Sequence, residues 1–109
     1  MRFSSDDILI DRVVNNETVF SNAIQLDYLF GYSVWAAWAG STIAGSILLQ
    51  ASLDGSNWND IANTTVTITG ASNNLWNISD AFYKYFRIKV ISDDANAITV
   101  NSKYYAKGV

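Results

Sequence analysis

The sequence contains no cysteine, no histidine and no proline. Without cysteine it can form neither disulfides nor thiolate metal sites. Without histidine it can build neither a Ser-His-Asp or Cys-His nucleophile system nor a metal site that needs imidazole. Proline commonly blocks the edge strands of β-sheets. We therefore expect any sheet edges to be protected by short strands, by charge or by a neighbouring subunit.

Charge is also scarce in this chain. Charged residues make up 16% of the sequence, against about 25% in typical globular domains. The 7 basic and 10 acidic residues give a net charge of −3, which argues against a nucleic-acid-binding surface. Because 50% of the 109 residues are hydrophobic, the chain can bury one core without metal or disulfide support. We expect a single β-sandwich domain over residues 1–109.

No long uninterrupted apolar run is present. The most apolar region, residues 28–51, is broken by small and polar residues such as Gly31 and Gly40, whereas a membrane span needs about 20 apolar residues in succession. The first residues turn acidic at Asp6 and Asp7, where a secretory signal needs an apolar run. The sequence therefore predicts no membrane contact and synthesis in a cytoplasm.

Alternation of apolar and polar residues predicts β-strands along most of the chain. In the clearest strand, residues 84–90, Phe86, Ile88 and Val90 alternate with outward residues, and Lys84 has the parity of the buried face. Turn signals recur about every 8 to 12 residues. The pattern predicts an all-β fold, an antiparallel β-sandwich of jelly-roll type with about eight strands. Further strands are expected at 7–14, 23–27, 32–39, 46–54, 58–61, 64–69 and 97–105.

Three turn segments separate the later strands. Residues 54–57, 70–74 and 92–96 are rich in Asp, Asn, Gly and Ser, which tolerate tight turning. In the strand expected at residues 46–54, before the first turn, side chains alternate between the two faces, so that one row points toward the core and the other toward solvent. The inward row is Ile47, Leu49, Ala51 and Leu53.

Two motifs resemble a known pattern. Residues 52–58 fit S-x-D-G-x-x-W, and residues 85–90 follow later with an aromatic residue and R-I-x-V. Over residues 45–91 the chain thus resembles discoidin-like, galactose-binding-like jelly rolls and small β-sandwich virion proteins of bacteriophages. In such a hairpin Asp54 and Gly55 make the turn, Trp58 folds back over it, and Arg87 faces outward to pair with a carboxylate or carbonyl. The sugar-binding relatives usually carry extra loops, for which this chain leaves little room, and a shared fold does not fix function.

The aromatic residues are the main candidates for contact with a partner. Trp35 and Trp38 have opposite strand parity, so one of them should face solvent or an interface unless a bulge intervenes. The four tryptophans could form a sugar-stacking platform, but packing of the core explains most of them more simply. Candidate residues for an interface or ligand surface are Trp35, Trp58, Tyr85, Arg87 and Tyr105.

The carboxylates make a weak catalytic case. Asp54 and Asp60 flank the predicted hairpin, and Asp93 and Asp94 lie in a predicted turn. An acid pair could cleave a glycosidic bond or hold Ca²⁺, but turn formation explains aspartate at these places. No base, nucleophile or ligand cluster accompanies them. We therefore expect no enzyme, no cofactor and no metal site, with sugar binding left open.

Low charge and outward Ser, Thr and Asn favour a protein that packs against others. Our first hypothesis is a bacteriophage virion structural protein, a decoration or minor component of capsid or tail. It would act through contacts with copies of itself and with other virion proteins, and would reside in the virion after synthesis in the host cytoplasm. The alternative is a carbohydrate-binding module or host-surface adhesin with a discoidin-like fold that uses Trp35 or Trp58. Size-exclusion chromatography and thermal shift with sugars distinguish the two hypotheses.

Overall fold

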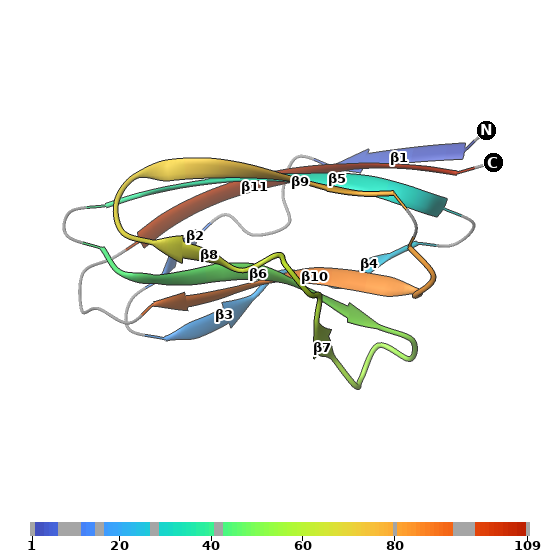
Figure 1. Cartoon of the computed structure of the whole chain (residues 1–109), viewed down its shortest axis with the longest axis horizontal. Coiled ribbons are helices and arrows are strands. Elements are labelled where there is room, and N and C mark those ends of the chain that lie inside the picture. Colours follow the sequence, from blue (N-terminus) through green and yellow to red (C-terminus); the bar gives the residue numbers. More distant parts are fainter. Residues whose placement is uncertain are drawn as a thin grey trace.

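The computed structural model describes residues 2–6, 12–14, 17–26, 29–40, 43–79, 81–92 and 98–108 (Figure 1). All regular secondary structure in these ranges is β, and within them no helix suited to crossing a membrane is found. The strands are β1 (Arg2–Asp6), β2 (Arg12–Val14), β3 (Thr18–Phe20), β4 (Ile24–Gln25), β5 (Leu29–Ala39), β6 (Gly45–Ser52), β7 (Asn59–Asp60), β8 (Val66–Ile68), β9 (Ser72–Ile78), β10 (Tyr85–Ser92) and β11 (Ile98–Gly108).

The strands form two antiparallel sheets that lie face to face (Figure 1). Sheet A has the order β1-β11-β5-β9, with β2 also on β11, and sheet B has the order β3-β10-β6-β7, with β4 also on β10 and β8 on β6. Because β1 and β2, β3 and β4, and β7 and β8 each share one edge of a longer strand, the strands occupy eight positions. Their order is that of a jelly roll, which confirms the predicted fold class.

The core lies between the two sheets and is built from one row of each strand. Phe86, Ile88 and Val90 of β10 are completely buried, so the alternation predicted for residues 84–90 is confirmed. The ring of Phe86 stacks on that of Tyr32 with centroids 4.1 Å apart. Trp38 points into the core and is buried, whereas Trp35 is half-buried on the opposite face of β5. The predicted division of these two tryptophans is therefore confirmed.

Close approach of two strands explains the glycine that begins β6. Gly45 pairs with Ser92 and has a φ of 154°. A Cβ at this position would lie 1.9 Å from the carbonyl oxygen of Ile91. Only glycine therefore fits here without a shift of the backbone.

The predicted turn at residues 70–74 is wrong over its second half. Ser72 already begins β9, which pairs with β5 from Ser72 opposite Trp38 to Ile78 opposite Tyr32. Two adjacent asparagines are typical of turns. Here a long-range pairing partner and the buried Trp76 side chain outweigh that local preference.

Three further expectations need correction. Leu53, predicted to face the core, is 69% exposed, because β6 ends at Ser52 and the chain turns away. The row of β6 predicted to face solvent is instead buried at Leu48 and Gln50. Lys84, predicted to share the parity of the buried face, is exposed because β10 begins only at the next residue.

Some predictions fall on parts of the chain without a described position. Of the predicted strand 7–14, only residues 12–14 are described, as β2. The predicted turn 92–96 is described only at its first residue, so Asp93 and Asp94 lie outside the described residues. Strands β1 and β3 were not predicted.

Candidate functional site

The hairpin between β6 and β7 is organised by Ser52 and Asp54. The Ser52 hydroxyl accepts the backbone N–H groups of Asp54 and Gly55, at 3.2 and 2.8 Å, and donates to Asp54 Oδ1 at 3.1 Å. Asp54 Oδ1 accepts the backbone N–H groups of Ser56 and Asn57, each at 2.8 Å. Gly55 has a φ of 80°, in the region that favours glycine. The expected turn at Asp54 and Gly55 is therefore present.

Both oxygens of the Asp54 carboxylate serve this turn. Asn57 donates its side-chain amide to Asp54 Oδ2 at 2.6 Å. Hydrogen bonds from the backbone N–H groups of Asn57 and Ser56, and then from the Asn57 amide, hold the pKa of Asp54 well below its ordinary range. A carboxylate with so low a pKa is a poor general acid at neutral pH, and its partners explain it as a turn residue.

Trp58 follows the turn of the hairpin, and its ring lies over the side chain of Arg87. The guanidinium carbon of Arg87 is 4.1 Å from the Trp58 ring centroid and 3.9 Å from the Phe20 ring centroid. Such cation–π contacts each contribute roughly 0.5–2 kcal/mol, depending on exposure. They join the end of β3, the loop after β6 and the middle of β10 on the outer face of sheet B.

A chain of hydrogen bonds runs beneath these rings. Arg87 Nε donates to Gln50 Oε1 at 2.8 Å, and Gln50 Nε2 donates to Asp60 Oδ1 at 2.8 Å. The buried amide of Gln50 is thus satisfied at both ends, and burial lowers the pKa of Arg87. The expectation that Arg87 pairs with a carbonyl is confirmed, although the carbonyl belongs to a side chain.

Tyr85 lies on the same outer face. It pairs with Ser52 of β6, and its ring is 3.7 Å from where a Cβ on Gly55 would lie. Three of the five candidate residues, Trp58, Tyr85 and Arg87, are therefore brought together. We call this region the Arg87 face, defined as Phe20, Gln50, Trp58, Asp60, Tyr85 and Arg87.

The other two candidates lie on the outer face of sheet A. Leu75 of β9, Trp35 of β5 and Lys103 of β11 form one row across three strands. The ammonium of Lys103 is 5.5 Å from the Trp35 ring centroid. Leu75 is 56% exposed and Tyr105 is 50% exposed. We call this region the Trp35 face, defined as Trp35, Leu75, Lys103 and Tyr105.

Polar side chains continue this face beside the row. Ser33 lies opposite both Tyr105 and Asn77 in the strand register. The Ser33 hydroxyl donates to Asn77 Oδ1 at 2.5 Å. The Trp35 face therefore offers exposed apolar area, with the neutral polar side chains of Ser33 and Asn77 beside it.

Sequence reasoning did not find Phe20, Gln50, Leu75 or Lys103 as parts of these faces. Phe20 and Gln50 reach Arg87 only through pairings of β10 with β3 and β6, which join segments far apart in the chain. Leu75 was missed because β9 was not recognised as a strand. Once the strands are placed, parity alone identifies Leu75 and Lys103 as outward residues.

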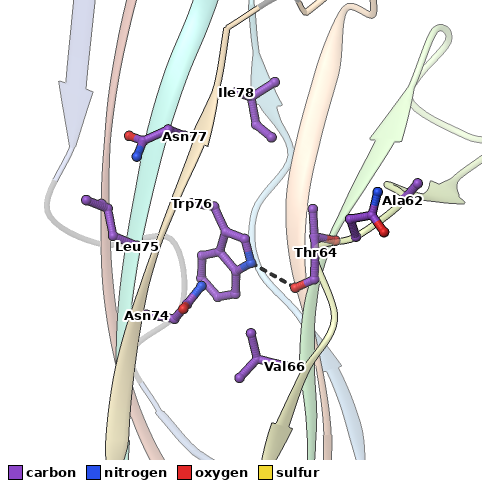
Figure 2. A pocket seen from close by; sticks show the side chains of 9 residues that line it. Ala62, Thr64, Val66, Asn74, Leu75, Trp76, Asn77 and Ile78 are labelled. Atoms are coloured by element: carbon purple, nitrogen blue, oxygen red, sulfur yellow. Dashed lines mark hydrogen bonds between the residues drawn. The ribbon is translucent and has the colours of Figure 1, made fainter.

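A groove separates β9 from the segment that leads into β8. It has a volume of about 440 Å³. The indole N–H of Trp76, from one wall, donates to the backbone carbonyl of Thr64, in the other wall, at 2.8 Å (Figure 2). Asn63, at its rim, has a φ of 65°. No charged side chain lines it; the lining residues are Ala62, Asn63, Thr64, Val66, Asn74, Leu75, Trp76, Asn77 and Ile78.

In the described ranges no group of three or more carboxylate, histidine or cysteine residues is placed to hold a metal ion. On the Arg87 face Arg87, Gln50 and Asp60 are joined by hydrogen bonds, and the Trp35 face carries aliphatic and aromatic groups with one ammonium, that of Lys103. Both arrangements suit packing and recognition.

No protein-family model matches the sequence, and no curated protein matches it. Solved structures do share its fold. The PBSX exported protein XepA matches with a TM-score of 0.74 and 10% identity, over 97% of this chain and 37% of that one. The SPBc2 prophage-derived protein YomS matches with a TM-score of 0.62 and 13% identity, over 96% and 92%. A chain of the disulfide-linked pili of Bacillus endospore appendages gives 0.65 and 11%, over 98% and 88%.

Two other kinds of protein share the fold. The T13 particle of infectious bursal disease virus contains a chain that matches with a TM-score of 0.61 and 10% identity, over 98% of this chain and 31% of that one. TmCBM61, solved with β-1,4-galactotriose, matches with a TM-score of 0.52 and 18% identity, over 95% and 86%. At these identities the likeness shows the fold, which is common to phage-derived proteins, viral and pilus assemblies, and carbohydrate-binding modules.

Proposed function

We propose that this chain is a structural component of a virion, most specifically a bacteriophage capsid- or tail-associated decoration or minor protein. It acts without catalysis, through contacts with copies of itself and with other virion proteins. The observation that carries this proposal is the Trp35 face. The outer surface of sheet A there exposes Leu75 and Tyr105 beside a half-buried tryptophan.

The composition of the Trp35 face favours a protein partner. Aromatic residues are enriched in the cores of protein interfaces, and charged residues are depleted there. Among its four residues only Lys103 is charged, and its ammonium already lies near the Trp35 ring. Covering the apolar area would contribute roughly 25 cal/mol for each Å² removed from water. We expect a second protein surface to cover this apolar area.

The kinds of protein that share the fold support an assembly role. Two come from phage-related sources, one from a virus particle and one from a pilus. The chain spans nearly the whole length of YomS and of the pilus protein, but only 37% of XepA. A domain of this size with this fold can therefore make up nearly all of such a protein, and we propose a building-block role for this chain.

Our proposal that the chain is not an enzyme is supported by the chemistry of its side chains. The sequence holds no histidine or cysteine, and the Asp54 carboxylate is committed to backbone N–H groups. Asp60 Oδ1 accepts a hydrogen bond from the Gln50 amide. We expect the net charge of −3 to exclude nucleic acid as a partner, and we propose no membrane partner.

Sedimentation velocity over a range of micromolar concentrations tests the proposal. We expect the purified chain to self-associate, and Tyr105→Ser to weaken that association. Leu53→Ser is the matched control, because Leu53 is also highly exposed but lies in the hairpin loop outside the Trp35 face. Mass spectrometry of particles from the host that carries the gene should find the chain in the virion. A strictly monomeric chain that is absent from particles would contradict the proposal.

Carbohydrate binding is the second candidate. It is favoured by the fold shared with TmCBM61 and by two partly exposed tryptophans on outer faces, Trp35 and Trp58. Each ring, however, already has a cation near one side. Thermal shift with β-1,4-galactan oligosaccharides should show a rise in melting temperature that Trp58→Ala or Trp35→Ala removes. A stable monomer with such a shift would replace the assembly proposal.

A further inference from the structure

The four edges of the two sheets differ in continuity. Within the described ranges, three edges are each made of two short strands: β1 with β2, β3 with β4, and β7 with β8. Short and interrupted edge strands are a common protection against unwanted pairing. The fourth edge is β9 alone, a continuous strand of seven residues.

β9 also lacks the other protective devices. Its sequence from Ser72 to Ile78 contains no charged residue, no proline and no glycine. Register with β5 runs along the strand without a shift, so no bulge turns the edge aside. The strand that pairs with β9 in the described part of the chain is β5. One side of its backbone therefore presents a row of N–H and C=O groups to any strand that approaches.

The uncharged groove lies along this edge. Residues 74–78 of β9 form one wall and residues 62–66 form the other. Figure 2 shows Trp76 pointing between the sheets while Leu75 points the opposite way. The residues that line the groove carry no charge, so the groove favours neither an acidic nor a basic partner strand.

We propose that β9 pairs antiparallel with β9 of a second copy of this chain, about a two-fold axis at Leu75. This inference rests on the proposed assembly function and names one of its interfaces. The length of β9 and its lack of charge identify the partner strand. Among the edge strands that the structure describes, β9 is the one with seven residues and no charge, whereas the others have five or fewer residues in strand.

A two-fold axis at Leu75 gives a self-complementary register. Leu75 lies opposite its own copy, and Asn73 lies opposite Asn77 of the partner, all on the outer face. The oxygen of Asn77 accepts the Ser33 hydroxyl, which leaves its amide nitrogen to donate to the partner's Asn73. Leu75, 56% exposed in the single chain, becomes covered. Sheet A would then continue across both copies, with Trp35 and Lys103 extending the row on each side.

A charge-swap experiment tests this register. Leu75→Lys and Leu75→Glu each place two like charges opposite one another, so each variant alone should lose at least tenfold in association constant by sedimentation equilibrium. An equimolar mixture should restore association, because lysine then faces glutamate. Leu53→Lys is the matched control at an exposed leucine outside β9, and it should associate like the unmodified chain.

Each outcome has a distinct meaning. Association unchanged in both Leu75 variants, loss in Leu53→Lys as well, or no recovery on mixing would overturn the pairing of β9 with itself while leaving self-assembly intact. An unmodified chain that stays monomeric at every concentration would overturn the proposed function too. Melting curves identify any variant that fails to fold.

A cysteine variant gives an independent readout that needs no charge. The chain has no cysteine, so Leu75→Cys introduces a single thiol at the proposed axis. Residues directly opposite in an antiparallel pair have Cα atoms about 4.5–5.5 Å apart, within the range of a disulfide. Mild oxidation should yield a covalent dimer from Leu75→Cys and much less from Leu53→Cys. Equal yields from the two variants would overturn the proposal.

Discussion

The outer faces of the two sheets carry the same kinds of residue but use them differently. On the Arg87 face the rings of Phe20 and Trp58 contact Arg87, whose Nε is bonded to Gln50. On the Trp35 face the large apolar side chains of Leu75 and Tyr105 are at least half exposed. The comparison teaches that outward rings stabilise the fold where they lie over one shared cation, and offer an interface where half or more of the side chain stays exposed.

The largest effect is expected on the Arg87 face. Arg87→Ala removes two ring contacts and leaves the buried amide oxygen of Gln50 without its donor. We expect the free energy of unfolding to fall by about 3 kcal/mol, measured by urea denaturation, with self-association of the folded protein unchanged. Lys89→Ala, on the same face of β10, is the control. A loss of association with normal stability would show that this face is an interface and would break the comparison.

The second-largest change in the free energy of unfolding is expected in the hairpin that carries Trp58. Gly55 has a φ of 80°, which a β-branched residue resists, so Gly55→Val should lower the free energy of unfolding by about 2 kcal/mol. Urea denaturation measures the change. A change below about 0.5 kcal/mol would mean that the turn does not require glycine at this position. Gly70→Val is the control, because a Cβ there meets no atom within 4 Å.

These two regions also show what the sequence could predict. The alternation of Phe86, Ile88 and Val90 predicts β10 because period-two alternation is a local property that burial of one face preserves. The hairpin at Asp54 and Gly55 was predicted for the same reason, since its hydrogen bonds join residues close in sequence.

The rest depends on contacts between distant segments. β9 was missed because Asn73 and Asn74 indicate a turn locally, while pairing with β5 decides their conformation. Gln50 was predicted to face solvent, yet Arg87 and Asp60 bond to it from two other strands. The five candidate residues could be listed from sequence, but their division between two faces required the register of both sheets.

Acid should weaken the hairpin through Asp54. Its pKa in the folded chain lies below the ordinary value, so it contributes stability above about pH 4, the ordinary aspartate pKa, and this contribution is lost as the pH falls further. We expect the melting temperature of Asp54→Asn to fall less steeply between pH 4 and pH 2 than that of the unmodified chain. Identical slopes would show that the hydrogen bonds at Asp54 do not stabilise the fold.

The smallest effect on stability is expected on the Trp35 face. Tyr105→Ser removes a ring that is half exposed, so the free energy of unfolding at high dilution should fall by only about 1 kcal/mol. The same variant should weaken association, as stated above. A large loss of stability with unchanged association would assign Tyr105 to the fold and reverse the contrast between the two faces.

Hydrogen–deuterium exchange at two protein concentrations, one above and one below the association midpoint, tests the central claim most directly. Assembly through β9 and the Trp35 face predicts that the amides of residues 72–78 exchange more slowly at the higher concentration, while those of the short edge strands β3 and β4 do not change. Equal exchange of residues 72–78 at both concentrations, in a protein that does associate, would contradict this account of the interface.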